Sequence, residues 1–294
     1  MRILFNKKFL KHNPDSMFEG AYRIKDFTDL ENTEASGEEF LNLIHEKDYI
    51  EKIRKACFDG EYMAEVKMNR DTWDAALTAV GLTLLAAQQN DFAAVRPPGH
   101  HAYRNKSEGF CFFNNIAIAS QHLVDQGKRV LILDIDAHHG NGLQDLFYCT
   151  DKVMYISIHQ MFTYPMTGFP EQCGEGNGEG FTFNYPLMLN SGDKEFMAKL
   201  DKALVKGRVF NPDVCAVAAG FDGYHKDRML NLNYSLQVYF DAGLKIRRSF
   251  RNVFAVLEGG YHEDIRKCVD TFIEGINRGA KPPDIKWDEG MAIG

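Results

Sequence analysis

The feature that most constrains the fold is a series of short apolar runs, which recur between longer amphipathic segments. Runs of this length without polar alternation are typical of strands that are covered on both faces, as in parallel sheets. They lie at residues 2–5, 92–95, 130–134, 153–158, 214–219 and 253–258. Because such strands alternate with helical patterns, the sequence predicts a doubly wound α/β fold.

The amphipathic segments predict the helices that cover this sheet. Helical periodicity extends over residues 71–88, 114–126, 193–206 and 235–249. A further helix is expected to begin at Ser36, because Glu39 follows at capping-box spacing. Gly127 is a suitable stop for the helix before it, and the glycine-rich stretch 174–180 is predicted to be a loop. The sequence contains no linker, repeat or low-complexity tract, so we expect a single domain over residues 1–294.

Composition narrows the classes of function. A net charge of −7 lacks the basic excess that is usual in nucleic-acid-binding domains. No window approaches the roughly 20 apolar residues of a membrane span, and the apolar stretch at the N-terminus is too short for a signal peptide. The six cysteines form no CxxC pair and suit a reducing compartment. We therefore expect a cytoplasmic protein without nucleic-acid or membrane partners; composition does not indicate its oligomeric state.

Polar clusters follow four of the predicted strands. They are RPPGHH at 96–101, DIDAHH at 134–139, GFDG at 220–223 and EGGY at 258–261. In open α/β sheets, ligands bind at the carboxyl ends of the strands. Packing alone does not explain polar residues at four such ends, so the sequence predicts a site at this edge of the sheet.

The DIDAHH cluster has the composition of a metal site. In an extended segment Asp134, Asp136 and His138 share one face, and two carboxylates beside an imidazole need a cation between them. Carboxylate and imidazole ligands suit zinc, and a catalytic zinc keeps three protein ligands and an open position. Asp222 is the candidate ligand from another strand end. The residues alone leave open a solvated acidic strand end and, for Asp222, an ordinary turn aspartate.

Two further clusters carry groups that could act beside a metal. His100 and His101 follow a Pro-Pro-Gly sequence that fixes the direction of the loop. They could be metal ligands, or a base and a charge-stabilising group. Tyr261, with a reference pKa near ~10, stays protonated at neutral pH and can donate to an oxyanion. A buried core tyrosine is equally compatible with the GGY sequence.

Taken together, these motifs resemble those of the zinc-dependent histone deacetylase family. That wider group includes acetylpolyamine amidohydrolases and acetoin-utilisation proteins. RPPGHH, GFCFFNN, DIDAHHGNG, ISIHQ, AAGFDG and LEGGY occur in the family's order, and the resemblance extends from His45 to Tyr261. HHGNG with EGGY is similar to the class II and the bacterial or archaeal members.

The resemblance implies an arginase–deacetylase fold, an α/β fold in which a single eight-stranded parallel sheet is flanked by helices. It implies that a zinc ion is bound by Asp136, His138 and Asp222. An arginase-like binuclear site is disfavoured, because Gly140 stands where a second metal needs an aspartate and GFDG offers one aspartate instead of two.

The resemblance also implies catalytic roles. His101 would be the general base and acid for the attacking water, and His100 would be an electrostatic group supported by Asp134. Tyr261 would polarise the acyl carbonyl and stabilise the tetrahedral intermediate. Asn141 stands where one branch of the family has aspartate, and similar members with asparagine are active.

A substrate tunnel and structural cation sites follow from the same resemblance. Phe110 and Tyr164 would form the aromatic walls of the tunnel, with Gly109 and Met229 beside them. Potassium ions would be bound at two places. The first is formed by Ser157 with Asp134, and the second by backbone carbonyls of Phe147, Thr150 and Val153.

Two segments depart from the family pattern. The usual N-terminal His-Pro-Glu signature is replaced by HNPDSMFEGAYRI at residues 12–24, which puts the rim built by that region in doubt. Arg228 and Met229 follow Asp227 where many members have Pro and Leu. The acidic gatekeeper of the eukaryotic polyamine-specific branch is therefore missing.

The predicted function is removal of acetyl or other acyl groups from the ε-amine of lysine in proteins or peptides. An N-acetylpolyamine hydrolase, which takes an acylated small amine, is the main alternative. A non-catalytic acyl-binding module is a third possibility, against which the full set of zinc-binding, histidine and tyrosine residues argues.

Overall fold

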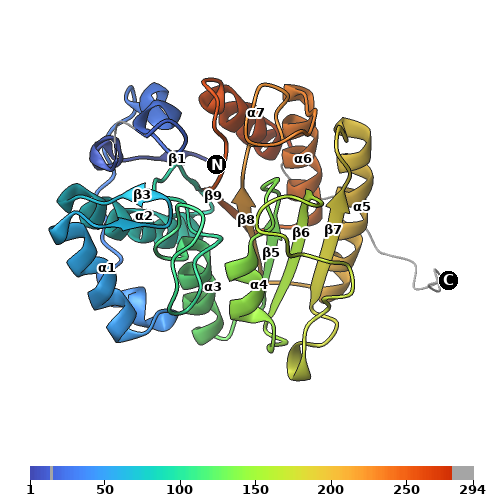
Figure 1. Cartoon of the computed structure of the whole chain (residues 1–294). Coiled ribbons are helices and arrows are strands. Elements are labelled where there is room, and N and C mark those ends of the chain that lie inside the picture. The colour runs from blue at the N-terminus through green and yellow to red at the C-terminus, as the bar shows by residue number, and fades with distance from the viewer. Residues whose placement is uncertain (14–15, 280–294) are drawn as a thin grey trace, which may run out of the picture.

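A computed structural model describes residues 1–13 and 16–279 (Figure 1). Its centre is one parallel sheet with the strand order β1-β4-β9-β8-β5-β6-β7. The strands are β1 Ile3–Leu4, β4 Phe92–Ala93, β9 Val253–Leu257, β8 Val214–Ala219, β5 Val130–Asp134, β6 Val153–Gln160 and β7 Thr182–Leu187. Every residue of β5, β6, β8 and β9 is buried, as the unbroken apolar runs predict.

Helices flank this sheet, which confirms the predicted α/β class. They are α1 Lys47–Asp59, α2 Arg70–Gln89, α3 Asn115–Asp125, α4 Asn141–Phe147, α5 Asp193–Phe210, α6 Leu236–Ser249 and α7 Ile265–Arg278. α2 packs against β4 and β9, α3 against β5 and β8, and α5 against β5, β6 and β7, while α6 and α7 pack on each other. The helices predicted from periodicity all form, within a few residues at each end.

The sheet has seven strands in the described residues, not the eight that the resemblance implies. Beyond β1 the chain makes a single parallel bridge, between Phe5 and Asn32, and Thr33 N donates to Phe5 O at 2.8 Å. The sequence around this bridge, TDLENTE, has only one apolar side chain to bury, that of Leu30. At the opposite edge β7 forms where no strand was predicted. Its sequence contains Pro186, which an edge strand tolerates.

The helix expected to begin at Ser36 is wrong in type and start. The segment forms a 3₁₀ helix, Glu38–Leu43, preceded by Gly37, and no capping box is present. Packing against α2 decides the position of this turn. Gly37 N donates to Leu77 O at 2.9 Å, and a Cβ on Gly37 would lie 2.2 Å from Val80 Cγ1. Tertiary contact therefore overrides the local capping signal.

The remaining elements are short. They are the hairpin β2 Tyr62–Met63 and β3 Val66–Lys67, and the 3₁₀ helices η1 Lys7–Lys11, η2 Ala21–Phe27 and η4 Gly176–Gly178, the last within the predicted loop 174–180. All six cysteines are free, and Cys215 is buried in β8. None of the helices in the described residues is long and apolar enough to cross a lipid bilayer.

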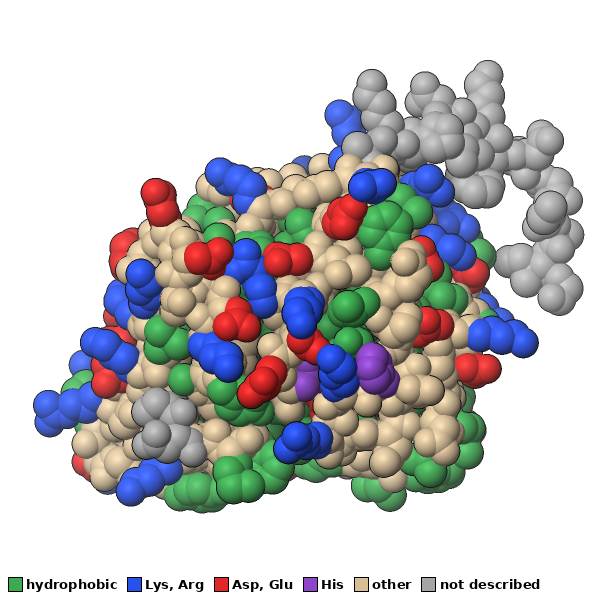
Figure 2. Space-filling model, turned by 90° about the horizontal axis from the view of Figure 1, so that it is seen from above, with side chains coloured by type: hydrophobic (Ala, Val, Ile, Leu, Met, Phe, Trp, Pro, Cys, Tyr) green, Lys and Arg blue, Asp and Glu red, His purple; other side chains and the backbone are tan. Residues whose placement is uncertain are grey.

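Figure 2 shows one face of the molecule, on which Lys and Arg side chains alternate with Asp and Glu side chains and hydrophobic side chains lie between them. The expected single domain over residues 1–294 includes residues 14–15 and 280–294, which lie outside the described residues.

Candidate active site

The four polar clusters meet at one edge of the sheet, as predicted. They follow β4, β9, β8 and β5, which are consecutive neighbours in the strand order. Because these strands are parallel, their carboxyl ends lie side by side. Strand order therefore brings together residues that are more than 160 positions apart in the sequence.

One buried group of side chains in the described residues can hold a metal ion, and it consists of Asp136, His138 and Asp222. One ligand atom from each lies within 4.8 Å of the other two. His138 Nδ1 lies 2.5 Å from Asp222 Oδ2 and 3.4 Å from Asp136 Oδ1. We call these three residues the metal group.

The backbone around the metal group holds both carboxylates in place. Gly259 N donates to Asp136 Oδ2 at 2.6 Å, and Ala137 N donates to Asp222 Oδ1 at 2.7 Å. A Cβ on Gly220 would lie 2.0 Å from Asp136 Oδ2. Glycine at position 220 is thus required because the carboxylate occupies the space of a side chain.

The charges of the metal group fit a bound cation. Burial, reinforced by the charge of Asp136, raises the pKa of Asp222 to about 7. Burial alone would lower the pKa of His138, but the charge of Asp222 and the hydrogen bond to Asp136 raise it to about 10. The group therefore retains protons when no metal is present. Two carboxylates and one imidazole are also the donor set that suits zinc.

Asp134 lies behind His100 and outside the metal group. Asp134 Oδ2 lies 3.3 Å from His100 Nδ1 and accepts a hydrogen bond from Tyr155 Oη at 3.0 Å. Strand β5 ends at Asp134, so the extended alternation that would align it with Asp136 stops there. A Cβ on Gly140 would lie 2.3 Å from Asp134 Oδ2, which leaves no room for an aspartate at position 140.

His101 is held by Asn141. His101 Nδ1 lies 2.7 Å from Asn141 Oδ1, and Asn141 Nδ2 donates to Glu108 Oε2 at 2.7 Å and to Tyr103 Oη at 3.0 Å. Burial, followed by the positive charges of His100 and His138, lowers the pKa of His101 well below its ordinary value. Sequence reasoning missed Glu108 and Tyr103, because no motif marks them.

A cavity of about 190 Å³ leads to these groups from the surface. The four residues expected in the tunnel, Gly109, Phe110, Tyr164 and Met229, line it together with Glu65, His101, His138 and Tyr261. The ring of Phe110 lies 5.8 Å from that of Tyr261, and the ring of Tyr164 lies 5.2 Å from that of His101. The walls of the cavity are therefore largely aromatic.

The turn at Gly109 and Phe110 shapes one wall of this cavity. Gly109 has φ +52°, and a Cβ on it would lie 2.5 Å from the ring of His101. Phe110 also has a positive φ, of +66°, and its N–H donates to Ala64 O at 3.1 Å. The tip of the β2–β3 hairpin, which carries Glu65, is thereby fixed at the wall of the cavity. No sequence motif indicates this contact.

Tyr261 is positioned from two sides. Tyr261 N donates to Asp227 Oδ2 at 2.6 Å, and the Arg23 guanidinium lies 4.8 Å from the centre of the tyrosine ring. Burial raises the pKa of Tyr261 well above its ordinary value, although Arg23 opposes the shift. The hydroxyl therefore remains a hydrogen-bond donor over the whole neutral range.

A second buried cluster lies behind the EGGY loop and was not predicted. We call His12, Glu19, Arg23 and Arg96 the N-terminal ion network. Glu19 Oε1 accepts from Arg96 Nε at 2.6 Å and from Arg23 Nη1 at 2.9 Å, and Glu19 Oε2 lies 3.2 Å from His12 Nε2. His12, Glu19 and Arg23 of the atypical N-terminal segment are thus buried in the protein.

This network supports the active-site loops through backbone atoms. Arg23 Nε donates to Gly260 O at 2.6 Å and Nη2 donates to Glu258 O at 2.5 Å. The Glu258 side chain in turn accepts from the backbone N–H groups of Gly99 at 2.7 Å and His100 at 3.0 Å. Glu258 is a further buried carboxylate. It belongs to the EGGY motif, but the motif alone predicts no role for it.

The residues of the expected potassium sites lie on and around β6. Ser157 pairs in register with Asp134, and its Oγ lies 2.8 Å from His159 Nδ1. Phe147 ends α4, Thr150 N donates to Phe147 O at 3.4 Å, and Val153 begins β6. The potassium sites remain a prediction.

Comparisons with known proteins agree with the motifs and the geometry. A probable deacetylase from Archaeoglobus fulgidus is 34% identical over 88% of this chain and 80% of its own length. Acetylpolyamine amidohydrolase 1 from Pseudomonas aeruginosa is 39% identical over 67% of this chain and 60% of its own length. The crystal structure of an acetylpolyamine aminohydrolase from Burkholderia pseudomallei, 26% identical, has a TM-score of 0.85 over 95% of this chain and 99% of that chain.

The family model described as the histone deacetylase domain matches residues 11–276. That range includes all four strand-end clusters and the N-terminal ion network. The resemblance inferred from the motifs is confirmed, and the chain belongs to the histone deacetylase domain family.

Proposed function

We propose that this chain is a zinc-dependent amide hydrolase that removes acetyl or other acyl groups from the ε-amine of lysine in proteins or peptides. Membership of a family of deacetylases and amidohydrolases supports hydrolysis of amides. The observation that carries the proposal is the position of the metal group, which lies at the inner end of an aromatic cavity that His101 and Tyr261 also line. We further propose a single catalytic domain in the cytoplasm.

Asp136, His138 and Asp222 would hold the zinc ion, and the potassium sites named above would be structural. When bound, zinc supplies a Lewis acid that polarises the acyl oxygen and makes a water molecule more acidic. All three zinc-binding side chains are buried, so this chemistry would take place away from bulk solvent.

The hydrogen bond to Asn141 defines which nitrogen of His101 can act as a base. Asn141 Nδ2 donates to Glu108 and Tyr103, so Asn141 Oδ1 is the acceptor that faces His101. Nδ1 of His101 therefore carries the hydrogen, and Nε2 carries the lone pair. Because burial keeps this imidazole neutral, Nε2 can take a proton from water and return it to the leaving amine.

His100 and Tyr261 would stabilise the charge that develops on the acyl oxygen. Burial alone would lower the pKa of His100, but the charges of Asp136 and Asp134 raise it to about 10. This imidazole is therefore protonated while its neighbour His101 is neutral. Tyr261 keeps its proton and can donate to the oxyanion.

The cavity favours an uncharged alkyl chain. Phe110 and Tyr164 provide aromatic walls, and acylation has removed the charge of the lysine amine. The N-acetylpolyamine alternative has one observation in its favour, the carboxylate of Glu65 at the cavity wall, which could attract a second amine. Substrate choice between these amines therefore depends on the groups around the cavity and not on the metal group.

The test is to measure the metal content of the protein and its hydrolysis of an acetyl-lysine peptide, acetylputrescine and acetylspermidine. We expect one zinc per chain and preference for the peptide. Tyr261→Phe and His101→Ala should each reduce kcat by about a hundredfold or more while zinc stays bound. Preference for a free polyamine by orders of magnitude would establish the alternative, and absence of both zinc and hydrolysis would indicate an acyl-binding module.

A further inference from the structure

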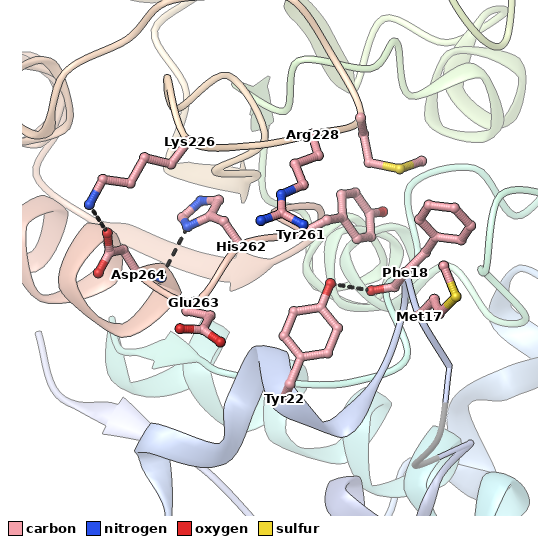
Figure 3. Close-up of a pocket in the computed structure, with 10 residues that line it drawn as sticks. Met17, Phe18, Tyr22, Lys226, Arg228, Tyr261, His262, Glu263 and Asp264 are labelled. Carbon is pink, nitrogen blue, oxygen red and sulfur yellow. Dashed lines mark hydrogen bonds and ion pairs between the residues drawn. The ribbon is translucent and has the colours of Figure 1, made fainter.

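A second cavity, of about 530 Å³, lies next to the tunnel mouth (Figure 3). Met229 and Tyr261 line both cavities, so the two share a border at the tunnel rim. A substrate whose acylated lysine side chain enters the tunnel has its peptide backbone outside, beside this border. The second cavity is therefore placed to contact the part of the substrate that the metal group does not reach.

The shared border is held by Asp227. Its Oδ1 accepts from Met229 N at 2.8 Å and its Oδ2 accepts from Tyr261 N at 2.6 Å. Both carboxylate oxygens are thus used to join the 227–229 turn to the Tyr261 loop. Arg228 stands between Asp227 and Met229 in this turn, so its backbone is fixed at the rim beside Tyr261.

Arg228 is the cation of this cavity that is left without an acidic partner. Lys226 Nζ lies 2.7 Å from Asp264 Oδ2, and Lys267 Nζ lies 2.5 Å from Asp264 Oδ1. In the described part of the chain, Arg228 makes neither an ion pair nor a hydrogen bond. In Figure 3 its guanidinium extends toward Tyr261, whereas the carboxylate of Glu263 lies on the side of Tyr22.

The opposite wall of the cavity is apolar and exposed. Met17 is 83% exposed and Phe18 is 50% exposed, both on the atypical N-terminal segment. Tyr22 Oη donates to Phe18 O at 2.7 Å and fixes the phenylalanine backbone at the rim. The cavity thus combines an apolar wall with an unpartnered guanidinium. This combination suits a carboxylate that is carried on an aliphatic or peptide group.

We propose that this cavity recognises a carboxylate on the part of the substrate that stays outside the tunnel, and that Arg228 is the residue that selects it. The proposal rests on the proposed deacylase function. A guanidinium can bind a carboxylate with two parallel hydrogen bonds. A polyamine would instead bring a second cation toward an unpaired guanidinium. The substrate class is therefore acyl-lysine with a neighbouring Asp or Glu, or acyl-lysine with a free α-carboxylate.

Two matched substrate pairs separate these sources of the carboxylate. The first pair is an acetyl-lysine peptide with Glu or Gln next to the acetylated residue. The second pair is a peptide that ends in acetyl-lysine, with a free or an amidated C-terminus. We expect kcat/KM to favour the carboxylate member of at least one pair by about five- to tenfold, through KM. The pair that shows the preference identifies the source.

Arg228→Gln should remove this preference, and Arg228→Glu should reverse it, with little change in kcat for the uncharged members. Arg248→Gln is the control. It makes the same charge change on an exposed arginine of α6, near the opposite edge of the sheet, where β9 begins. Raising the salt concentration should weaken the wild-type preference.

Equal kcat/KM values within both pairs would overturn the proposal while leaving the deacylase function intact. So would a preference that survives Arg228→Gln. Hydrolysis of acetylputrescine and acetylspermidine, with no turnover of any acetyl-lysine substrate, would instead contradict the proposed function, and the carboxylate proposal with it. The two failures are therefore distinct.

Discussion

Two buried polar clusters lie on either side of the EGGY loop, and they differ in how completely their charges are paired. In the N-terminal ion network every N–H of Arg96 has a partner, either the Glu19 carboxylate or a backbone carbonyl. In the metal group two carboxylates converge on a single imidazole. Arg96 is thus fully paired within the protein, whereas the carboxylates of the metal group require a proton or a cation from outside the protein.

The pKa values express this difference. Burial would raise the pKa of Glu19, but the charge of Arg96 and the contact with His12 lower it to about 2, so the carboxylate is stable as an anion. Asp222 is buried to the same degree, yet its pKa is raised to about 7. Arg96 thus makes the buried Glu19 a structural anion. The carboxylates of the metal group have no arginine beside them in the described residues and would be compensated by a bound cation.

The largest effect on activity should come from a substitution in the metal group. Asp136→Asn removes a zinc ligand, and we expect zinc content to fall with a loss of activity of about a thousandfold or more. Chelation should lower the thermal midpoint of the wild type but leave that of the variant unchanged, because only the wild type gains stability from the metal. A variant that keeps zinc and activity would show that Asp136 is not a ligand.

A substitution in the N-terminal ion network should instead lower the stability of the fold. Arg96→Met leaves Glu19 buried without its main partner, and we expect a loss of about 3–5 kcal/mol in the free energy of unfolding, measured with urea. Arg2→Met is the control, because the Arg2 side chain of the Arg2–Asp91 pair is exposed to solvent and its loss should cost clearly less. Equal effects of the two substitutions would mean that the network contributes no more than a surface ion pair.

The two clusters also differ in how far they could be predicted from sequence. The metal group was predicted because its residues follow buried strands, and apolar runs reveal both the strands and their carboxyl ends. Glu19 and Arg23 follow no strand, and Arg96, which also donates to Glu19, is more than 70 positions away. No local pattern reveals such a pairing, and the expectation for residues 12–24 therefore concerned only the rim.

Two smaller differences between the predicted and the observed structure also arise from contacts between distant segments. The helix start at Ser36 fails because α2 contacts Gly37. Glu65 reaches the tunnel through a hairpin that is held by Phe110 N. Strand and helix positions could thus be predicted locally, whereas the groups that surround the tunnel depend on how distant loops meet.

Lowering the pH should affect the metal group and the N-terminal ion network at different pH values. Metal binding requires deprotonated ligands, and the pKa values of Asp222 and His138 are raised to about 7 and about 10 in the metal-free protein. Zinc affinity should therefore fall by about tenfold or more per pH unit below pH 7. Glu19, whose pKa is lowered, contributes stability that is complete above its ordinary pKa of 4.5 and is lost as the pH falls through about 2.

Zinc should consequently leave at a higher pH than that at which the fold is lost. A chromophoric chelator reports zinc release and circular dichroism reports folding, and both are measured on the same samples from pH 7 down to about pH 2. Coincident transitions would show that zinc binding and the N-terminal ion network are not independent.

The smallest expected effect is on His101, which lies beside the metal group. Its partner Asn141 is neutral and fully hydrogen-bonded, so Asn141→Asp adds a charge without changing shape. An adjacent carboxylate should raise the pKa of His101 by about 1–3 units, which protonates the base at neutral pH. We expect kcat/KM at pH 7 to fall by about tenfold or more and the acidic limb of its pH profile to move upward. Because the new carboxylate also faces Glu108, Asn141→Asp with Glu108→Gln is the control, and it should keep the shifted limb. An unchanged profile in both variants would mean that His101 is not the group whose protonation limits the reaction.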